Sequence, residues 1–243
     1  LVLLIAARAL PAGFLDTNLD RVAKCWRSYL SQFQFLDLSP RLMREYSSDQ
    51  AEDLGEQGEN LSQILASICQ NSEIKSQILE WISELIVPKV DAIEFYRTKL
   101  GEVMLKLREA NDVERWFFAR SLSDGTLRFL GLLAALYSAV PGQLFLLEEI
   151  ETGLHPTRVQ LVVELLERFA ASKNIQIIAT THSPQVLLSL SQDALRNVIH
   201  CARDEEKHAT VTHRLGDLPH FEEVTQKTQI DRLFSTGWME HVV

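Results

Sequence analysis

A short apolar run that ends in two carboxylates constrains the fold of this chain more than any other stretch. Residues 144–156 read LFLLEEIETGLHP, in which four apolar residues are followed directly by Glu148 and Glu149. A continuous apolar run of this length is typical of a strand buried on both faces of a parallel sheet. Open parallel sheets bind their ligands beyond the carboxyl ends of the strands. The stretch therefore predicts an α/β fold with a polar site at one sheet edge.

The two carboxylates are candidates for different chemical roles. Consecutive strand residues point to opposite faces, so Glu148 and Glu149 are not expected to share one role. Glu148 could hold a hydrated Mg²⁺, an ion that favours carboxylate oxygens and keeps several of its waters. Glu149 could orient and deprotonate an attacking water. The alternative is an acidic loop after a buried strand, and this stretch alone does not choose between the two.

A histidine is expected at the same edge. Residues 157–171 have apolar residues at helical spacing, and the run IQIIA from Ile175 to Ala179 is followed by TTHSP. The strand–helix–strand order implies a parallel crossover, which brings His182 to the edge that carries the two carboxylates. A histidine at a strand end is usually structural, but one that shares an edge with two carboxylates is a candidate functional residue.

A helix with a polar start precedes this unit. In the stretch Arg120–Gly142 (RSLSDGTLRFLGLLAALYSAVPG), Ser123 is predicted as the N-cap, with Asp124 and Gly125 in the first turn. A helix start offers unpaired backbone N–H groups and the positive end of the macrodipole, which suit phosphate oxygens. The alternative is that Ser123 only caps a core helix.

The first 115 residues carry weaker signals, and we expect a mostly helical supporting subdomain there. The opening LVLLIAARAL is predicted as a core-facing helix, with a signal peptide as the alternative. Two amphipathic helices are expected further on, the first capped by Asn60 and the second ended by Pro88. A strand pair around Gly101 is expected between Val90 and Arg108.

Composition limits the class of protein. The 243 residues are 46% hydrophobic and 23% charged, which is ordinary for a soluble globular chain of one or two domains. The formal charge of -9 argues against broad nonspecific binding of nucleic acid or of membrane surfaces. Cys25, Cys69 and Cys201 show no paired spacing and are expected to be reduced thiols. We therefore expect a cytoplasmic protein without a membrane partner.

Three stretches together carry a family resemblance. SLSDGTLR resembles the signature motif of ABC-type ATPases, LFLLEEIETGLHP their Walker B motif and D-loop, and IIATTHSP their switch-histidine loop. The motifs stand in the family's order, and the chain is most similar to RecF-like and OLD-like ATPases, often catalogued as AAA-type. The closing stretch LGDLPHFEEVTQKTQIDRLFSTGW resembles the tail of these proteins. The resemblance implies the carboxyl-terminal portion of an ABC ATPase-like P-loop NTPase, with a parallel sheet and a mostly helical insertion.

The resemblance also implies roles for single residues and the cofactors ATP and Mg²⁺. Glu149 would be the general base, His182 would sense the γ-phosphate, and Glu148 would help hold Mg²⁺ through water. The implied nucleotide-binding residues are Ser123, Asp124, Gly125 and Thr126 of the signature, and Gly153, Leu154 and His155 of the D-loop. The signature would contact ATP bound on a partner subunit, which implies a head-to-tail homodimer.

The chain departs from the family pattern at three points. Glu148 stands where many ABC proteins have Asp, and Asp124 replaces a glycine of the signature. A carboxylate at Asp124 must point away from the phosphate or be offset by a cation. The third departure is that no GxxxxGK[ST] phosphate loop occurs in the chain. We therefore expect residues 116–243 to form a carboxyl-terminal ATPase lobe, residues 1–115 its insertion, and the phosphate-loop lobe to lie outside the chain.

Two functions remain open at this point. In the first, the full-length protein is a dimeric ATPase, and the isolated chain is inactive because it lacks the phosphate loop. In the second, the chain is a non-catalytic interaction module that retains the ATPase fold. Glu149, Ser123 and His182 favour the first function, since a decayed site has no reason to keep all three residue types. DNA or a partner protein could bind through regions outside this chain.

Overall fold

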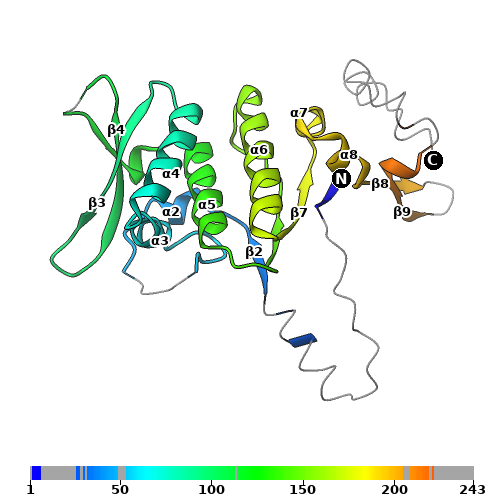
Figure 1. The fold of residues 1–243 in the computed structure, drawn as a ribbon, viewed down its shortest axis with the longest axis horizontal. Helices are drawn as coiled ribbons and strands as arrows, with labels where there is room; N and C mark the ends of the chain where they lie inside the picture. Colours follow the sequence, from blue (N-terminus) through cyan, green and yellow to red (C-terminus); the bar gives the residue numbers. More distant parts are fainter. Residues whose placement is uncertain are drawn as a thin grey trace. The chain divides into compact units, whose positions relative to one another are not determined.

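The chain forms two compact units. The computed structural model describes residues 2–6, 26–27, 30, 32–48, 53–112, 114–204, 208–218 and 221. The first unit comprises Leu1–Phe35, Val140–Glu151 and Val159–Val243, and the second comprises Leu36–Ala139 and Thr152–Arg158. Each unit contains a sheet (Figure 1). The predicted division into an insertion of residues 1–115 and a lobe of residues 116–243 stays a prediction.

The first unit is built on a six-stranded mixed sheet with the order β2-β6-β7-β1-β8-β9. Strands β6 (Leu144–Leu147) and β7 (Gln176–Thr181) pair in parallel, which confirms the predicted parallel pair. They are joined in sequence by α6 (Pro156–Lys173), whose buried residues include Val159, Val162 and Leu166. The remaining elements are β2 (Phe33–Leu36), α7 (Pro184–Ser189), α8 (Gln192–Arg196), β8 (Val198–Asp204), β9 (Ala209–Arg214) and the 3₁₀ helix η2 (Leu215–Asp217).

Residues Val2–Ala6 of the opening apolar run form a strand, so the predicted helix is wrong there, and residues 1 and 7–10 lie outside the described residues. Strand β1 (Val2–Ala6) lies between β7 and β8 and pairs antiparallel with both. A five-residue apolar run fits a strand in the middle of a sheet as well as a turn of a core helix, because hydrophobic periodicity cannot separate the two over so short a length. The antiparallel pairing of β1, β8 and β9 is what makes this sheet mixed rather than wholly parallel.

In the second unit, four helices pack beside a three-stranded antiparallel sheet (Figure 1). The helices are α2 (Pro40–Met43), α3 (Leu61–Ile68), α4 (Ser72–Leu85) and α5 (Asp124–Ser138). The strands are β3 (Val90–Arg97), β4 (Val103–Glu109) and β5 (Trp116–Phe118), and the 3₁₀ helix η1 (Ala119–Ser121) follows them. The predicted strand pair around Gly101 is confirmed, whereas β5 was not predicted.

The predicted cap of one helix does not act as expected, and the cap of a second helix was not predicted. Asn60 precedes α3, but its side chain does not cap the helix. It binds the preceding loop instead, accepting from the Gly55 N–H at 2.8 Å and donating to the Asp53 carbonyl oxygen at 2.9 Å. Helix α4 is capped by Asn71, whose side chain accepts from two first-turn N–H groups, and it ends three residues before Pro88.

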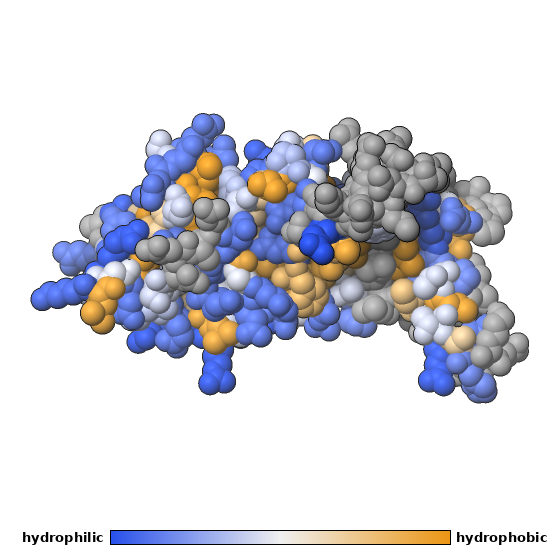
Figure 2. Space-filling view, turned by 90° about the horizontal axis from the view of Figure 1, so that it is seen from below, coloured by the Kyte–Doolittle hydropathy of each residue, from blue (hydrophilic) through white to orange (hydrophobic). Residues whose placement is uncertain are grey.

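In the part of the chain that the structure describes, none of the helices is long and apolar enough to cross a bilayer. The face drawn in Figure 2 is mainly hydrophilic, with apolar residues in separate patches. Cys69 and Cys201 are not joined in a disulfide. Cys25 and most of the predicted tail, residues 219–220 and 222–243, lie outside the described residues.

Candidate functional site

The predicted carboxylate pair lies in a turn directly after β6. The strand ends at Leu147, and Glu148 and Glu149 are both exposed. Glu149 has a φ of 43°, a left-handed conformation that is uncommon for any residue but glycine. Its backbone N–H donates to Thr180 Oγ1 at 3.1 Å. Because both residues stand beyond the strand, strand alternation does not separate them, and the turn at Glu149 sets their directions instead.

A third acid, Glu151, ties this turn to the end of β7. Its Oε2 accepts from the Thr181 hydroxyl at 2.7 Å, and its Oε1 accepts from the His182 backbone N–H at 2.9 Å. The Thr181 side chain is buried, and its hydroxyl also accepts from the Ser183 N–H at 3.0 Å. His182 is therefore held at the sheet edge that carries the two predicted carboxylates. Glu151 was not predicted as a site residue, and its only sequence signal is a third carboxylate two positions beyond the pair.

The signature residues begin α5 in the second unit. Ser123 is the N-cap, and its Oγ accepts from the Thr126 N–H at 3.2 Å and shares a hydrogen bond with Thr126 Oγ1 at 2.8 Å. Thr126 is buried, whereas Ser123 is exposed. Within the described residues, the backbone N–H groups of Asp124 and Gly125 make no hydrogen bond. The predicted capping by Ser123 is confirmed, and two first-turn donors remain for a ligand.

The Asp124 carboxylate is paired with a cation from another element. Arg44 Nη2 lies 2.6 Å from Asp124 Oδ1 and also donates to the Leu122 carbonyl oxygen at 2.8 Å. The Arg44 side chain is 26% exposed and that of Asp124 is 64% exposed. The cation that Asp124 was expected to need is therefore present, although sequence reasoning had not identified it. A partner 80 positions earlier leaves no local signal in the sequence.

The D-loop residues pack against the start of α5 within the same unit. A Cβ atom at Gly125 would lie 2.2 Å from the Gly153 carbonyl oxygen and 3.2 Å from Leu154 Cδ2, so no side chain fits there. Gly153 has a φ of 79°, which favours glycine. His155 is exposed, and its Nδ1 is hydrogen-bonded to Thr157 Oγ1 at 2.9 Å in the first turn of α6. The structure thus brings the signature and the D-loop together.

The predicted site residues fall into two groups. Glu148, Glu149 and His182 belong to the first unit, and the signature and D-loop residues belong to the second. In the part of the chain that the structure describes, no three His, Cys, Asp or Glu side chains gather as a metal site. A Mg²⁺ ion bound with a nucleotide needs only one or two carboxylates beside phosphate oxygens and waters. The exposed carboxylate of Glu148 fits that requirement.

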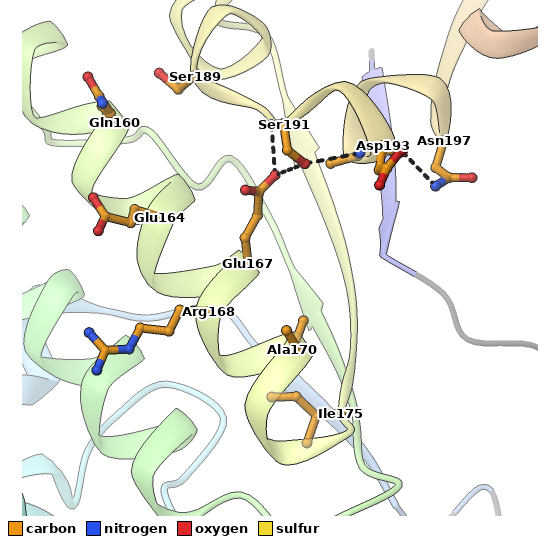
Figure 3. Close-up of a pocket in the computed structure, with 12 residues that line it drawn as sticks. Gln160, Glu164, Glu167, Arg168, Ala170, Ile175, Ser189, Ser191, Asp193 and Asn197 are labelled. Atoms are coloured by element: carbon orange, nitrogen blue, oxygen red, sulfur yellow. Dashed lines mark hydrogen bonds between the residues drawn. The ribbon is translucent and has the colours of Figure 1, made fainter.

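A separate open hollow lies between α6 and the α7–α8 region of the first unit (Figure 3). Its volume is about 850 Å³, and its acidic lining residues are Glu164, Glu167 and Asp193. Glu167 Oε1 accepts from both the N–H and the hydroxyl of Ser191, at 3.0 and 2.9 Å. This carboxylate therefore fixes the start of α8, and none of the predicted site residues lines the hollow.

Comparison with known families identifies the family of the chain. A family model described as "AAA domain, putative AbiEii toxin, Type IV TA system" matches residues 26–189, which include every predicted site residue. The chain belongs to this AAA-domain family. The predictions of a P-loop ATPase family and of an α/β fold are thereby confirmed. The narrower placement with RecF-like and OLD-like proteins stays a prediction.

Solved structures show partial likeness. The Smc head domain with a coiled coil and joint from Pyrococcus yayanosii matches with a TM-score of 0.48 and 12% identity, over 71% of this chain and 29% of that one. A structure described as "Structural biochemistry of ATP-driven dimerization and DNA stimulated activation of SMC ATPases" has a TM-score of 0.47 and 12% identity, over 71% and 97%. The SmcHead bound to the C-winged helix domain of ScpA has a TM-score of 0.46 and 15% identity, over 72% and 53%. The chain spans under a third of the first of these chains and about half of the last, and the family assignment rests on the sequence match.

Proposed function

We propose that this chain of the AAA-domain family is part of an ATPase that hydrolyses ATP in a head-to-tail dimer. The observation that carries the proposal is the parallel pair β6–β7, whose neighbouring ends present Glu148, Glu149 and His182 at one edge. Hydrolysis also needs a phosphate loop, which is not among these 243 residues. We propose that polypeptide outside them supplies it, that residues 116–243 act as the carboxyl-terminal lobe, and that residues 1–115 are its insertion.

Glu149 is the general base of the proposed reaction. Its carboxylate takes a proton from the attacking water as the water oxygen bonds to the γ-phosphorus and ADP leaves with the bonding electron pair. The left-handed backbone at Glu149 supports this role, because such a conformation costs roughly 1–3 kcal/mol and persists only where the surroundings hold it. Here the Thr180 hydroxyl accepts from the Glu149 N–H and helps to hold the turn.

Glu148 and His182 complete the proposed edge. Glu148 would hold Mg²⁺ through water, and the ion would supply positive charge to offset that of the nucleotide phosphates. The His182 ring senses the γ-phosphate. Its backbone is held by Glu151, whose carboxylate also reaches the Thr181 hydroxyl. A hydrogen-bonded loop of this kind keeps the ring in place before the nucleotide arrives.

The signature binds the γ-phosphate of ATP held by the partner subunit in this proposal. The donors are the Ser123 hydroxyl and the N–H groups of Asp124 and Gly125. When the Thr126 hydroxyl donates to Ser123 Oγ, Ser123 keeps its own proton for a phosphate oxygen. Gly153, Leu154 and His155 then form the dimer interface beside the signature, which Gly153 and Leu154 already contact at Gly125.

Replacing Glu149 by Gln tests the assignment of the base. In the natural protein, Glu149→Gln keeps the shape of the side chain but cannot take a proton. Turnover should fall about 10²- to 10⁴-fold, while ATP binding and the ATP-bound dimer persist. Glu164→Gln is the matched control, because Glu164 is an exposed carboxylate on α6 away from the predicted edge. Steady-state phosphate release near the wild-type rate in Glu149→Gln would move the base elsewhere.

Mixing two inactive variants tests the dimer. Ser123→Arg blocks the nucleotide of the partner subunit, and replacing the phosphate-loop lysine removes the subunit's own nucleotide site. Each variant should be inactive alone. A mixed dimer has one composite site with both parts intact, so phosphate release should recover in part. Full activity of Ser123→Arg alone would reduce Ser123 to a helix cap. Absence of any ATPase activity in the natural protein would favour the non-catalytic module instead.

A further inference from the structure

The first turn of α5 carries a negative charge where the proposed function places a phosphate. Asp124 is the first residue of the helix, directly after the Ser123 cap. A carboxylate in a first turn stabilises its own helix, but it opposes the binding of an anion at the same end. The unpaired donors of Asp124 and Gly125 and the charge of Asp124 therefore act in opposite directions on a phosphate.

Arg44 lies where it can offset the negative charge of Asp124. Its Nη2 donates to the Leu122 carbonyl oxygen at 2.8 Å and to Asp124 Oδ1 at 2.6 Å, so it holds the residues on both sides of Ser123. The side chain of Arg44 is 26% exposed and that of Asp124 is 64% exposed, so the pair lies at the surface and is open to screening by salt. One guanidinium thus offsets the charge of Asp124 and fixes the backbone segment that contains Ser123.

The backbone of Arg44 is itself fixed against α5. Arg44 is the C-cap of α2, and its N–H donates to the Leu42 carbonyl oxygen. Met43, the residue before it, is buried. A Cβ at Gly131 of α5 would lie 2.8 Å from Met43 Cε, so α2 packs directly on α5 at this glycine. The guanidinium therefore extends from the end of α2, which packs against α5, and contacts the first turn of α5.

We propose that Arg44 is a positioning residue for the signature. By neutralising Asp124 and holding the Leu122 carbonyl, Arg44 lets Ser123 and the first-turn N–H groups receive a phosphate without an opposing charge. The inference rests on the proposed function, because it assigns Arg44 a part in the binding of the partner's nucleotide. It accounts for the aspartate in place of a signature glycine, since the charge is acceptable only beside its cation.

A charge-rescue experiment in the natural protein tests the proposal. The variants are Arg44→Gln, Asp124→Asn and the double variant, assayed for KM, kcat and ATP-dependent dimerisation. Arg44→Gln should raise the ATP concentration for half-maximal dimerisation about 3- to 30-fold, because one unscreened charge is left at a helix N-terminus. Adding Asp124→Asn should restore most of the loss. Raising the salt concentration should reduce the difference in this ATP concentration between Arg44→Gln and the wild type, because the carboxylate of Asp124 is 64% exposed and is screened by salt.

Two further variants separate positioning from folding. Arg44→Lys keeps the charge. Its ATP concentration for half-maximal dimerisation should stay within about 3-fold of the wild-type value, even if Arg44→Gln has a lower melting temperature. Arg108→Gln is the control. Arg108 on β4 makes a comparable pair with Asp91 on β3 at 2.9 Å, and their side chains are 29% and 37% exposed. A purely structural role predicts that Asp124→Asn gives no rescue, because the contact to Leu122 stays lost.

The outcomes distinguish this inference from the function on which it rests. An active wild type with an Arg44→Gln variant of unchanged KM and unchanged dimerisation would overturn the inference alone. Absence of rescue by Asp124→Asn would also overturn it. A natural protein without ATP-dependent dimerisation or turnover would overturn the proposed function, and the positioning role with it. Loss on Arg44→Gln, rescue by Asp124→Asn and no effect of Arg108→Gln together support the proposal.

Discussion

Removing the Glu151 carboxylate should detach the loop that carries His182 from the turn after β6. Glu151→Ala deletes the acceptor of the Thr181 hydroxyl, at 2.7 Å, and of the His182 N–H, at 2.9 Å. Hydrogen bonds to charged groups contribute about 1.5–3 kcal/mol each, but water can replace the lost partner at the exposed His182. The Thr181 side chain is only 1% exposed, so its hydroxyl loses a partner that water cannot easily replace. We expect the free energy of unfolding to fall by about 2 kcal/mol.

Glu151→Gln should cost less than Glu151→Ala, because its amide oxygen can still accept from one of the two donors, the Thr181 hydroxyl or the His182 N–H. We expect a loss of about 1 kcal/mol. Thr181→Val removes the hydroxyl and keeps the shape of the side chain. A double-mutant cycle between Glu151→Ala and Thr181→Val should therefore give a coupling energy of at least about 0.5 kcal/mol.

Urea unfolding followed by circular dichroism measures these differences. The control is Glu164→Ala, because Glu164 is exposed on α6 and its side chain makes no hydrogen bond within the described residues. That substitution should stay within about 0.5 kcal/mol of the wild type. If Glu151→Ala matches this control, or if the cycle shows no coupling to Thr181, then the carboxylate does not hold the loop and the reasoning from the two distances is refuted.

Two other perturbations have definite expected results. Gly125→Ala forces a Cβ to within 2.2 Å of the Gly153 carbonyl oxygen and should lower the free energy of unfolding by about 1–3 kcal/mol, measured in the same way. Gly55→Ala, which meets only the end of a flexible side chain, should lower it less, and equal losses would contradict the close contact. Burial raises the pKa of the Cys69 thiol from 9.0 to about 11, so its thiolate is about 100-fold scarcer at neutral pH. In a Cys25→Ser chain, a disulfide reagent should label half-buried Cys201 well before Cys69, and the reverse order would contradict the burial of Cys69.

The parallel pair and its helix could be predicted because their signals are local. The apolar runs before Glu148 and before Thr180 are short and end in polar residues, and a helical pattern of the right length separates them. Burial of such runs under helices is a strong constraint, so strand type and order followed from the sequence. The capping of α5 by Ser123 was predictable for the same reason, since a cap depends on residues three positions apart.

The opening strand could not be predicted, because its identity depends on neighbours far along the chain. Strand β1 is placed by pairing with β7 and β8, which follow it by more than 170 residues. Over five residues, the pattern VLLIA does not distinguish a strand from a core helix. The side chain of Asn60 illustrates the same limit at short range, because the preceding loop competes with the helix for its amide and obtains it.

The contacts that organise the candidate site could not be predicted from the sequence, for a related reason. The need of Asp124 for a cation followed from electrostatics, but nothing in the sequence distinguished Arg44 from the other arginines as the residue that supplies it. Glu151 was one of three acids within four residues, and its partners lie 30 and 31 positions away. Electrostatic reasoning can therefore predict that a partner exists, whereas only the fold identifies it.

The contact between two glycines constrains how the signature and the D-loop can act. Gly125 admits no Cβ because the Gly153 carbonyl oxygen occupies that space, and Gly153 has a positive φ that favours glycine. Gly125 is thus required by the position of Gly153, and Gly153 is favoured by its own backbone conformation. Closely packed backbone has no flexible side chain to absorb a displacement, so the D-loop cannot shift toward α5 without moving the Ser123 cap. In the proposed dimer, the two motifs would therefore reach the partner's nucleotide as one rigid surface, and a change at either would alter both.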